Sequence, residues 1–279
     1  MTSECHWHNQ LGYRHVYQLR PDPIRNPRTI AVANHKGGAA KTTTAVNLAA
    51  GLAKRGRRVM LLDLDPQANA SAWLGGGGDA GIFAVLTENR TLDSLLTRSV
   101  VEGVALVTAS QRLAGAERIL ANELAAETTL KRRLEDTDLS RWDYVILDTP
   151  PALNLLTVNA LTAADEVLVP VEAHVLALSG VAQIVATIEL VRSRLNPKLL
   201  PPRFLLCRFD PRTRHSSEVR ESLMAKFGDQ VLATIIRENI RLAEAPSFSE
   251  PIESYAPSSQ GAADYGALAT EIIGMETTR

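Results

Sequence analysis

Short apolar runs alternate with amphipathic runs along much of the chain. Apolar segments of strand length occur within residues 29–34, 58–67, 142–151 and 203–207. The run Ala45–Ala53, between the first two segments, is alanine-rich and amphipathic, as expected for a helix. Strands that are apolar along their whole length are typical of parallel sheets covered on both faces. The pattern therefore predicts an α/β fold, with a doubly wound, mostly parallel sheet and helices on both faces.

The composition fits one globular unit. The chain has 279 residues, of which 45% are hydrophobic, enough to bury one substantial core. Length alone also allows two domains, but no linker-like tract rich in proline, glycine and serine divides the chain. We therefore expect residues 29–279 to form a single domain. Residues 1–28 are polar and carry several aromatic side chains, and we expect them to be a flexible N-terminal extension.

A glycine-rich segment joins the first apolar run to the amphipathic run. It reads Lys36-Gly37-Gly38-Ala39-Ala40-Lys41-Thr42-Thr43. A strand that turns through glycines into a helix gathers free backbone N–H groups and the positive end of the helix dipole, where a polyphosphate can be held. Lys41 can place an ammonium group on the β and γ phosphates, and the Thr42 hydroxyl can hold Mg²⁺. The segment predicts a nucleotide-phosphate site.

Carboxylates follow two of the predicted strands. Asp63 and Asp65 end the second apolar run, and Asp148 ends the third. Ligands of open α/β sheets bind at the carboxyl ends of the strands, so we expect these three side chains to converge on the phosphate segment. Carboxylates at such a place hold Mg²⁺ or orient an attacking water. A single aspartate there would more simply be a turn residue, but three together favour a magnesium site.

The phosphate segment departs from the general P-loop pattern, G-x-x-x-x-G-K-[ST]. Ala40 stands where that pattern has a glycine, and Lys36 adds a second lysine at the start of the loop. The arrangement resembles K-G-G-x-x-K-[ST], the deviant Walker A motif of the ParA/MinD ATPase superfamily. D-x-D-P-Q after the second strand and D-T-P-P after the third are similar to the switch segments of its ParA/Soj partition ATPases. The resemblance extends from about Arg28 to Gly274.

The resemblance implies a role for each matching residue. Lys41 would be the phosphate lysine, Thr42 the Mg²⁺ ligand, and Lys36 a lysine that reaches the nucleotide of a partner subunit. Asp65 would position the attacking water, and Asp148 would be the Walker B carboxylate. The candidate sets are therefore catalytic (Lys36, Lys41, Asp65, Asp148), metal-binding (Thr42, Asp63, Asp65, Asp148) and ATP-binding (Lys36, Gly37, Gly38, Ala39, Ala40, Lys41, Thr42, Thr43).

The same resemblance implies a function. A ParA/Soj-like protein would be a P-loop NTPase that uses ATP and Mg²⁺, turns ATP over weakly by itself and forms an ATP-sandwich homodimer. It would bind double-stranded DNA non-specifically and drive chromosome or plasmid segregation with a ParB-type partner. Such a protein would be cytoplasmic and associated with the nucleoid. The presence of only two cysteines, Cys5 and Cys207, also favours a reducing compartment.

Charge is distributed unevenly along the chain. The net charge is −1, yet residues 192–241 contain eleven lysines and arginines against five acids, a local balance of +6. A cationic surface can bind phosphodiester backbones without reading their sequence, although a solvated helix face would have the same composition. The resemblance places DNA-binding residues at Arg212 and Arg241. Arg214 stands where relatives commonly have asparagine.

Two other functions are compatible with the motifs. One is a ParA-like ATPase that positions a protein cargo, such as a chemoreceptor cluster or a microcompartment. The other is a MinD-like membrane switch, which requires an amphipathic C-terminal helix. The segment Ile272–Arg279 has no cationic apolar face, so we expect no membrane partner.

Overall fold

The computed structural model describes residues 27–78, 80–174 and 177–278. The predicted N-terminal extension lies outside the described residues except for its last two positions. In the described part, eight strands form one sheet in the order β3-β4-β2-β5-β1-β6-β7-β8. The strands are β1 (Arg28–Val32), β2 (Val59–Asp63), β3 (Leu96–Arg98), β4 (Val104–Val107), β5 (Tyr144–Asp148), β6 (Glu166–Glu172), β7 (Arg203–Phe209) and β8 (Val231–Arg237).

The sheet is parallel except at one edge. β3 pairs antiparallel with β4, and all the other neighbouring strands pair in parallel. The central strands β1, β2 and β5 are buried along their whole length, because helices cover both faces of the sheet. This confirms the predicted doubly wound α/β fold of the P-loop NTPase type.

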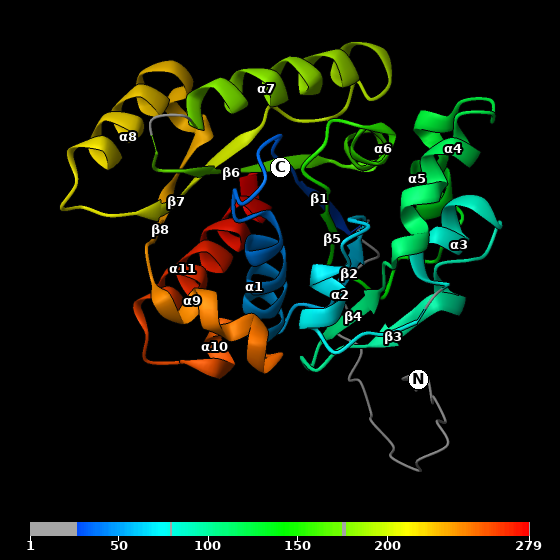
Figure 1. Ribbon diagram of the computed structural model, residues 1–279, viewed down its shortest axis with the longest axis horizontal. Helices are drawn as coiled ribbons and strands as arrows, with labels where there is room; N and C mark the ends of the chain where they lie inside the picture. The colour runs from blue at the N-terminus through cyan, green and yellow to red at the C-terminus, as the bar shows by residue number, and fades with distance from the viewer. Residues whose placement is uncertain (1–26, 79, 175–176, 279) are drawn as a thin grey trace.

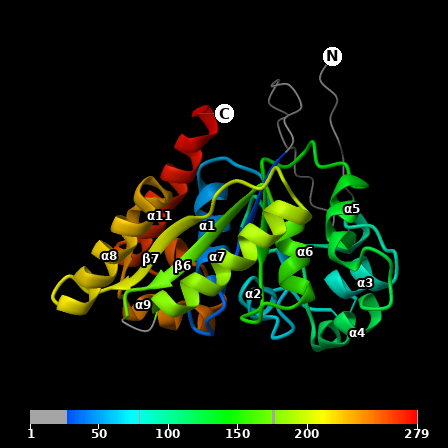
Figure 2. The same ribbon diagram turned by 90° about the horizontal axis from the view of Figure 1, so that it is seen from above.

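Helices connect the strands and cover the sheet (Figures 1 and 2). The α-helices are α1 (Lys41–Lys54), α2 (Asn69–Trp73), α3 (Gly81–Thr87), α4 (Ala116–Leu120), α5 (Thr129–Glu135), α6 (Leu155–Ala163), α7 (Ala177–Arg194), α8 (Arg214–Phe227), α9 (Ile240–Glu244), α10 (Ile252–Tyr255) and α11 (Gln260–Gly274). Short 3₁₀ segments occupy Asp93–Leu95, Gln111–Gly115, Ala126–Thr128, Gly228–Gln230, Ala245–Phe248 and Met275–Thr278.

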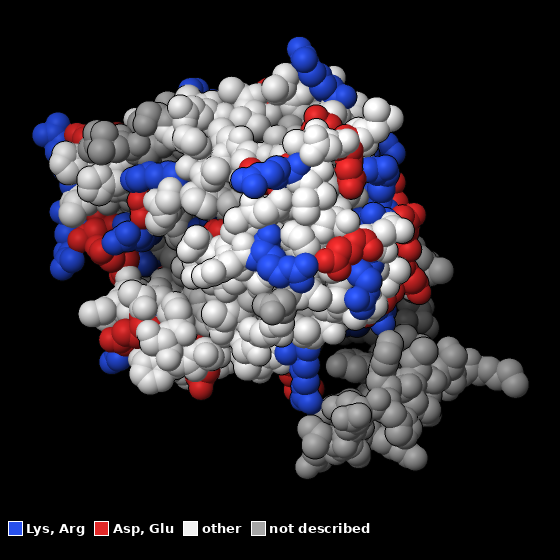
Figure 3. Space-filling view, turned by 45° about the vertical axis from the view of Figure 1, so that its right-hand side comes forward, with Lys and Arg blue, Asp and Glu red and all other residues white. Residues whose placement is uncertain are grey.

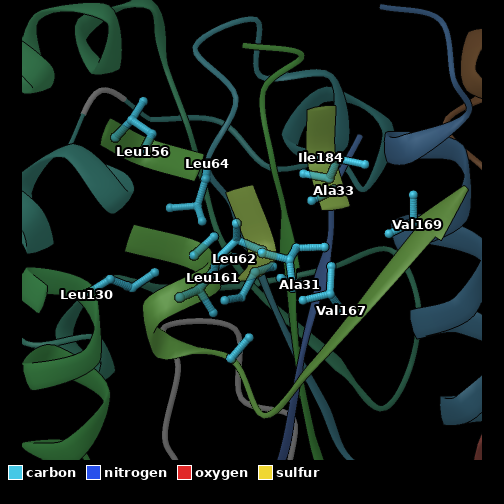
Figure 4. Packing of buried hydrophobic residues seen from close by; sticks show 14 of the residues in the cluster. Ala31, Ala33, Leu62, Leu64, Leu130, Leu156, Leu161, Val167, Val169 and Ile184 are labelled. Atoms are coloured by element: carbon cyan, nitrogen blue, oxygen red, sulfur yellow. The ribbon is translucent and has the colours of Figure 1, made fainter. Parts of the chain in front are cut away.

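The core has two layers, one on each face of the sheet. Ile30 and Val32 of β1 belong to the layer that contains the buried residues of α1 and α11. Ala31, between them, faces the opposite layer, which includes residues of α6 and α7 (Figure 4). This alternation follows from the two-residue period of a strand. Helix α1, which carries the phosphate segment at its N-terminus, is thereby fixed against the centre of the sheet.

The register of the central strands brings three strand ends level with one another. β5 lies between β1 and β2, and Asp148 is the ladder partner of Val32 on one side and of Asp63 on the other. The loop from β1 to α1 starts at the same edge. The residues that follow these strands therefore surround the N-terminus of α1.

Candidate nucleotide and magnesium site

The loop from β1 to α1 contains two left-handed residues. Gly38 has φ 78°, and Ala40, directly before the first residue of α1, has φ 58° and ψ 24°. Glycine adopts this conformation freely, whereas alanine is strained there by about 1–2 kcal/mol. The helix nevertheless begins directly after this turn, since the N–H of Thr44 donates to the carbonyl of Ala40 at 2.8 Å. The substitution of glycine by alanine is therefore accommodated, at the cost of backbone strain.

Lys41, the first residue of α1, is held inside the loop. Its side chain is buried, and its ammonium group donates to the carbonyl oxygen of Lys36 at 3.1 Å. Burial lowers the pKa of Lys41, while the carboxylates of Asp148 and Asp65 act in the opposite direction. A desolvated ammonium group next to a turn of backbone amides is suited to an anion such as a phosphate.

Asp148, at the end of β5, is a fully buried carboxylate. Neither of its oxygens has a hydrogen-bond partner among the described residues, although the Thr42 hydroxyl is close enough to lower its pKa. Burial and then the neighbouring Asp63 raise the pKa of Asp148 well above its ordinary value. An unpaired buried carboxylate is costly, and a cation beside it would remove that cost.

Thr42 and Asp148 therefore fit Mg²⁺ on chemical grounds, because both offer oxygen ligands at the phosphate end of the loop. The described residues contain no cluster of three or more histidines, cysteines or acidic residues able to hold a metal alone. Magnesium at phosphate sites commonly uses one or two protein ligands together with phosphate oxygens and water. Thr42 and Asp148 would be two such protein ligands, and phosphate oxygens and water would complete the coordination of the ion.

Asp63, at the end of β2, is fully buried and its oxygens are already engaged. Oδ1 accepts the N–H of Asp65 at 3.0 Å, and Oδ2 accepts both the N–H and the hydroxyl of Ser71 at 2.8 Å and 2.7 Å. Burial raises the pKa of Asp63 to about 6, against these hydrogen bonds. The side chain thus fixes the turn into α2, and its role as a metal ligand stays a prediction. No sequence pattern had singled out Ser71.

Asp65 lies on the turn between β2 and α2, next to Lys41 and Asp148. It is buried, and its Oδ1 accepts the N–H of Gln67 at 2.9 Å. Its charge acts on the pKa values of both neighbours, so the three side chains lie within electrostatic range of one another. The structure thus gathers Lys41, Thr42, Asp63, Asp65 and Asp148, as the strand-end argument predicts. Their individual roles stay predictions.

A cavity of about 820 Å³ opens beside the phosphate loop. Gly38, Ala40 and Thr43 form one wall. The other walls come from the end of β7 and the turn after it, from the end of β8 and α9 beyond it, and from α11 (Cys207, Arg208, Phe209, Asp210, Pro211, Arg212, Ile236, Arg237, Glu238, Asn239, Ile240, Leu242, Ala243, Gln260, Tyr265). Sequence analysis did not identify these contacts. The strand-end rule applied to β7 and β8 would have pointed to the segments that follow both strands.

Arg212 comes from the turn after β7 and Arg241 from α9, and both of these segments line the cavity. The Arg212 side chain is 87% exposed and forms a two-bonded ion pair with Asp210, at 2.9 Å and 2.8 Å. Arg241 donates to Glu244 Oε2 at 2.8 Å, and the Tyr255 hydroxyl donates to the same oxygen at 3.0 Å. Both arginines are accessible, and each has an acidic neighbour. Their binding of DNA stays a prediction.

The side that carries α3–α5 has a mixed surface charge. Figure 3 brings this side forward, and basic and acidic groups are interspersed over it.

Of the helices in the described ranges, none combines the length and the apolar character that crossing a membrane requires.

Comparisons with known proteins agree with this geometry. The family model described as "AAA domain" matches residues 27–200. The chromosome-partitioning ATPase Soj of Thermus thermophilus is 46% identical over 246 residues, which cover 88% of this chain and 95% of that protein. The sporulation initiation inhibitor protein Soj of Bacillus subtilis is 42% identical over 248 residues, covering 88% and 98%.

A solved structure is similar as well. The cobyrinic acid a,c-diamide synthase of Mycobacterium smegmatis, solved with bound ADP and magnesium, superposes with a TM-score of 0.77 and 35% identity. The similarity covers 90% of this chain and 96% of that one.

Proposed function

The chain belongs to the ParA/Soj-type partition ATPases of the ParA/MinD superfamily, and on that basis we propose that it is a Mg-ATP-dependent dimerising switch that moves DNA. In this proposal the ATP-bound dimer binds double-stranded DNA non-specifically in the cytoplasm, on the nucleoid. Hydrolysis, stimulated by a ParB-type centromere-binding protein, releases it. The result is segregation of a chromosome or plasmid.

The observation that carries the nucleotide-binding part of the proposal is the unbalanced charge around the phosphate loop. Asp148 is fully buried without a hydrogen-bond partner among the described residues, and Lys41 is buried against a backbone carbonyl. A Mg²⁺–nucleotide complex would supply a cation to Asp148 and phosphate oxygens to Lys41.

The phosphates would lie against the backbone of residues 36–43, with Lys41 on the β and γ phosphates. Thr42 and Asp148 would hold Mg²⁺, which stabilises the charge that develops on the phosphate oxygens. Asp65 would accept a hydrogen bond from the attacking water and orient it in line with the γ phosphate. Water then displaces ADP from the γ-phosphoryl group, and the products are ADP and inorganic phosphate.

The cavity beside the loop supports a nucleotide with a base. It begins at Gly38 and Thr43, where the phosphates would lie, and extends toward Pro211, on the turn after β7, and Leu242, in α9. A volume of about 820 Å³ is within the ordinary range for small-molecule sites. We place the adenine and ribose of ATP between these two segments. Because Arg212 and the neighbours of Arg241 line the same cavity, nucleotide binding would order the cationic surface next to it.

Binding of a fluorescent, slowly hydrolysed ATP analogue, with and without Mg²⁺, tests the proposal. The wild type should bind with Mg²⁺ and lose most of its affinity in EDTA. Lys41→Ala should bind at least about tenfold more weakly, because the charge on the β and γ phosphates is lost. Lys54→Ala, which removes an exposed lysine at the other end of α1, is the matched control. Wild-type affinity in Lys41→Ala would reject the site.

A further inference from the structure

Lys36 is held within its own subunit through both its main chain and its side chain. The carbonyl accepts the ammonium group of Lys41 at 3.1 Å, and the N–H donates to Asn34 Oδ1 at 3.2 Å. The Lys36 ammonium group lies 3.2 Å from Glu172 Oε2. The ion pair joins the phosphate loop to the last residue of β6, 136 positions away in the sequence.

Glu172 has a second cationic partner. Its side chain is only 12% exposed, and its Oε1 accepts Arg208 Nη1 at 3.0 Å. Arg208 interrupts β7 with φ 52° where the pairing with β8 shifts register. A positive φ at such a position redirects a side chain, and here the arginine lies between Glu172 and Glu238, 3.0 Å and 3.9 Å from their carboxylates. Glu172 would therefore keep a cation if Lys36 moved away.

We propose that Glu172 is a positioning residue that retains Lys36 in its own subunit and so raises the protein concentration needed for assembly of the ATP-bound dimer. The inference rests on the proposed function, and on the role in the nucleotide site of a partner subunit that the family resemblance implies for Lys36. One ammonium group cannot lie against Glu172 and against the phosphates of another chain at the same time. Dimerisation thus exchanges the carboxylate partner of Lys36 for a phosphate, while Arg208 stays on Glu172.

The size of the effect follows from the exposure of the pair. The Lys36 side chain is 38% exposed, so the ion pair is weak enough to open, with a contribution typical of partly solvated pairs. Each dimer opens two such pairs. Removing the carboxylate should therefore lower the dimer dissociation constant by about 2- to 30-fold.

The first measurement concerns the single subunit. In nucleotide-free protein, a short pulse of an acetylating reagent followed by mass spectrometry reports how freely the Lys36 amine reacts. Glu172→Gln should increase acetylation of Lys36 severalfold and leave Lys198 unchanged. Glu218→Gln removes an exposed carboxylate from α8, outside the site, and should change neither. Equal reactivity of Lys36 in the wild type and in Glu172→Gln would show that Glu172 does not hold this lysine in its own subunit.

The second measurement concerns assembly. Sedimentation in Mg-ATP, with Asp65→Ala present in every protein to slow hydrolysis, gives the dimer dissociation constant. Adding Glu172→Gln should lower it, and adding Glu218→Gln should not. A dimer whose dissociation constant is unchanged or higher with Glu172→Gln would overturn the role of Glu172 alone. Failure of all three proteins to dimerise with ATP, and of the wild type to dimerise with a slowly hydrolysed ATP analogue, would overturn the proposed function, and the role of Glu172 with it.

Discussion

Asp63 and Asp148 are ladder partners on the adjacent strands β2 and β5, and both carboxylates are completely buried at the same edge of the sheet. Their proximity contributes to the raised pKa of Asp148, after burial itself. Two such groups are stable together only if protons or cations neutralise them. The contribution of this pair to the stability of the protein should therefore fall as the pH rises, and Mg²⁺ should restore it.

We predict that Asp148→Asn stabilises the nucleotide-free protein in EDTA, and more at pH 8 than at pH 5. A carboxyl group whose pKa is raised by folding stabilises the fold while it is protonated, below its ordinary pKa. That stability is lost as the pH rises through the folded-state pKa, which for Asp148 lies well above its ordinary value. The gain at pH 8 should be about 1–3 kcal/mol in the free energy of unfolding, measured with urea.

Asp143→Asn is the matched control. Asp143 forms an ion pair with Arg58 that lowers its pKa against partial burial, so this substitution should destabilise the protein at pH 8. Destabilisation by Asp148→Asn at pH 8 would show that Asp148 has a favourable partner within the protein.

Ala40→Gly should relieve the strain of the left-handed turn before α1. We expect the free energy of unfolding to rise by about 1 kcal/mol, because glycine adopts φ near 58° without a penalty. Affinity for an ATP analogue should be unchanged or higher. Ala39→Gly is the control, since Ala39 is buried with ordinary backbone geometry and should lose stability. A large loss of affinity in Ala40→Gly would mean that its methyl group packs productively around the nucleotide.

Local signals predicted four of the strands in the described residues (β1, β2, β5 and β7), the phosphate loop and the approach of Asp63, Asp65 and Asp148 to it, but not β3, β4, β6 or β8. Element ends were less accurate. β1 ends at Val32 rather than near Asn34, because the Asn34 amide donates to the carbonyl of Pro170 and its Oδ1 accepts the N–H of Lys36. α1 begins at Lys41, several residues before the predicted amphipathic run. Both shifts depend on contacts or turn geometry that periodicity does not encode.

The contacts that sequence analysis could not supply join distant parts of the chain. The ion pair of Lys36 with Glu172 requires the pairing of β1 with β6, and the cavity requires β7 and β8 side by side. Nothing in the local pattern around Glu172 or Arg208 indicated their partners. Strand order, which the motifs do not determine, decides which strand ends meet.

Asp65→Ala should separate ATP binding from hydrolysis. If Asp65 orients water and does not hold the nucleotide, the variant loads ATP, hydrolyses it at least about tenfold more slowly and accumulates as a dimer. Size-exclusion chromatography with light scattering, in Mg-ATP and in Mg-ADP, gives the dimer fraction. Hydrolysis at the wild-type rate would remove Asp65 from the mechanism, and failure to load ATP would assign it to nucleotide binding instead.

Arg212 and Arg241 should bind DNA only when two copies of each are brought together by ATP. Replacing both with alanine should weaken all duplex sequences alike and flatten the salt dependence, because each lost phosphate contact changes the slope of log affinity against log salt by about 0.9. ATP loading should be intact. Arg118→Ala with Arg132→Ala, which removes two exposed arginines from α4 and α5, outside residues 192–241, is the matched control and should leave the slope unchanged.

The most direct test is fluorescence anisotropy of a labelled random duplex titrated with protein in Mg-ATP, in Mg-ADP and without nucleotide, at several salt concentrations. The proposed switch predicts tight, sequence-independent and salt-sensitive binding in Mg-ATP, and at least about tenfold weaker binding in the other two conditions. Equal DNA affinity with and without ATP, or no binding in Mg-ATP, would contradict it.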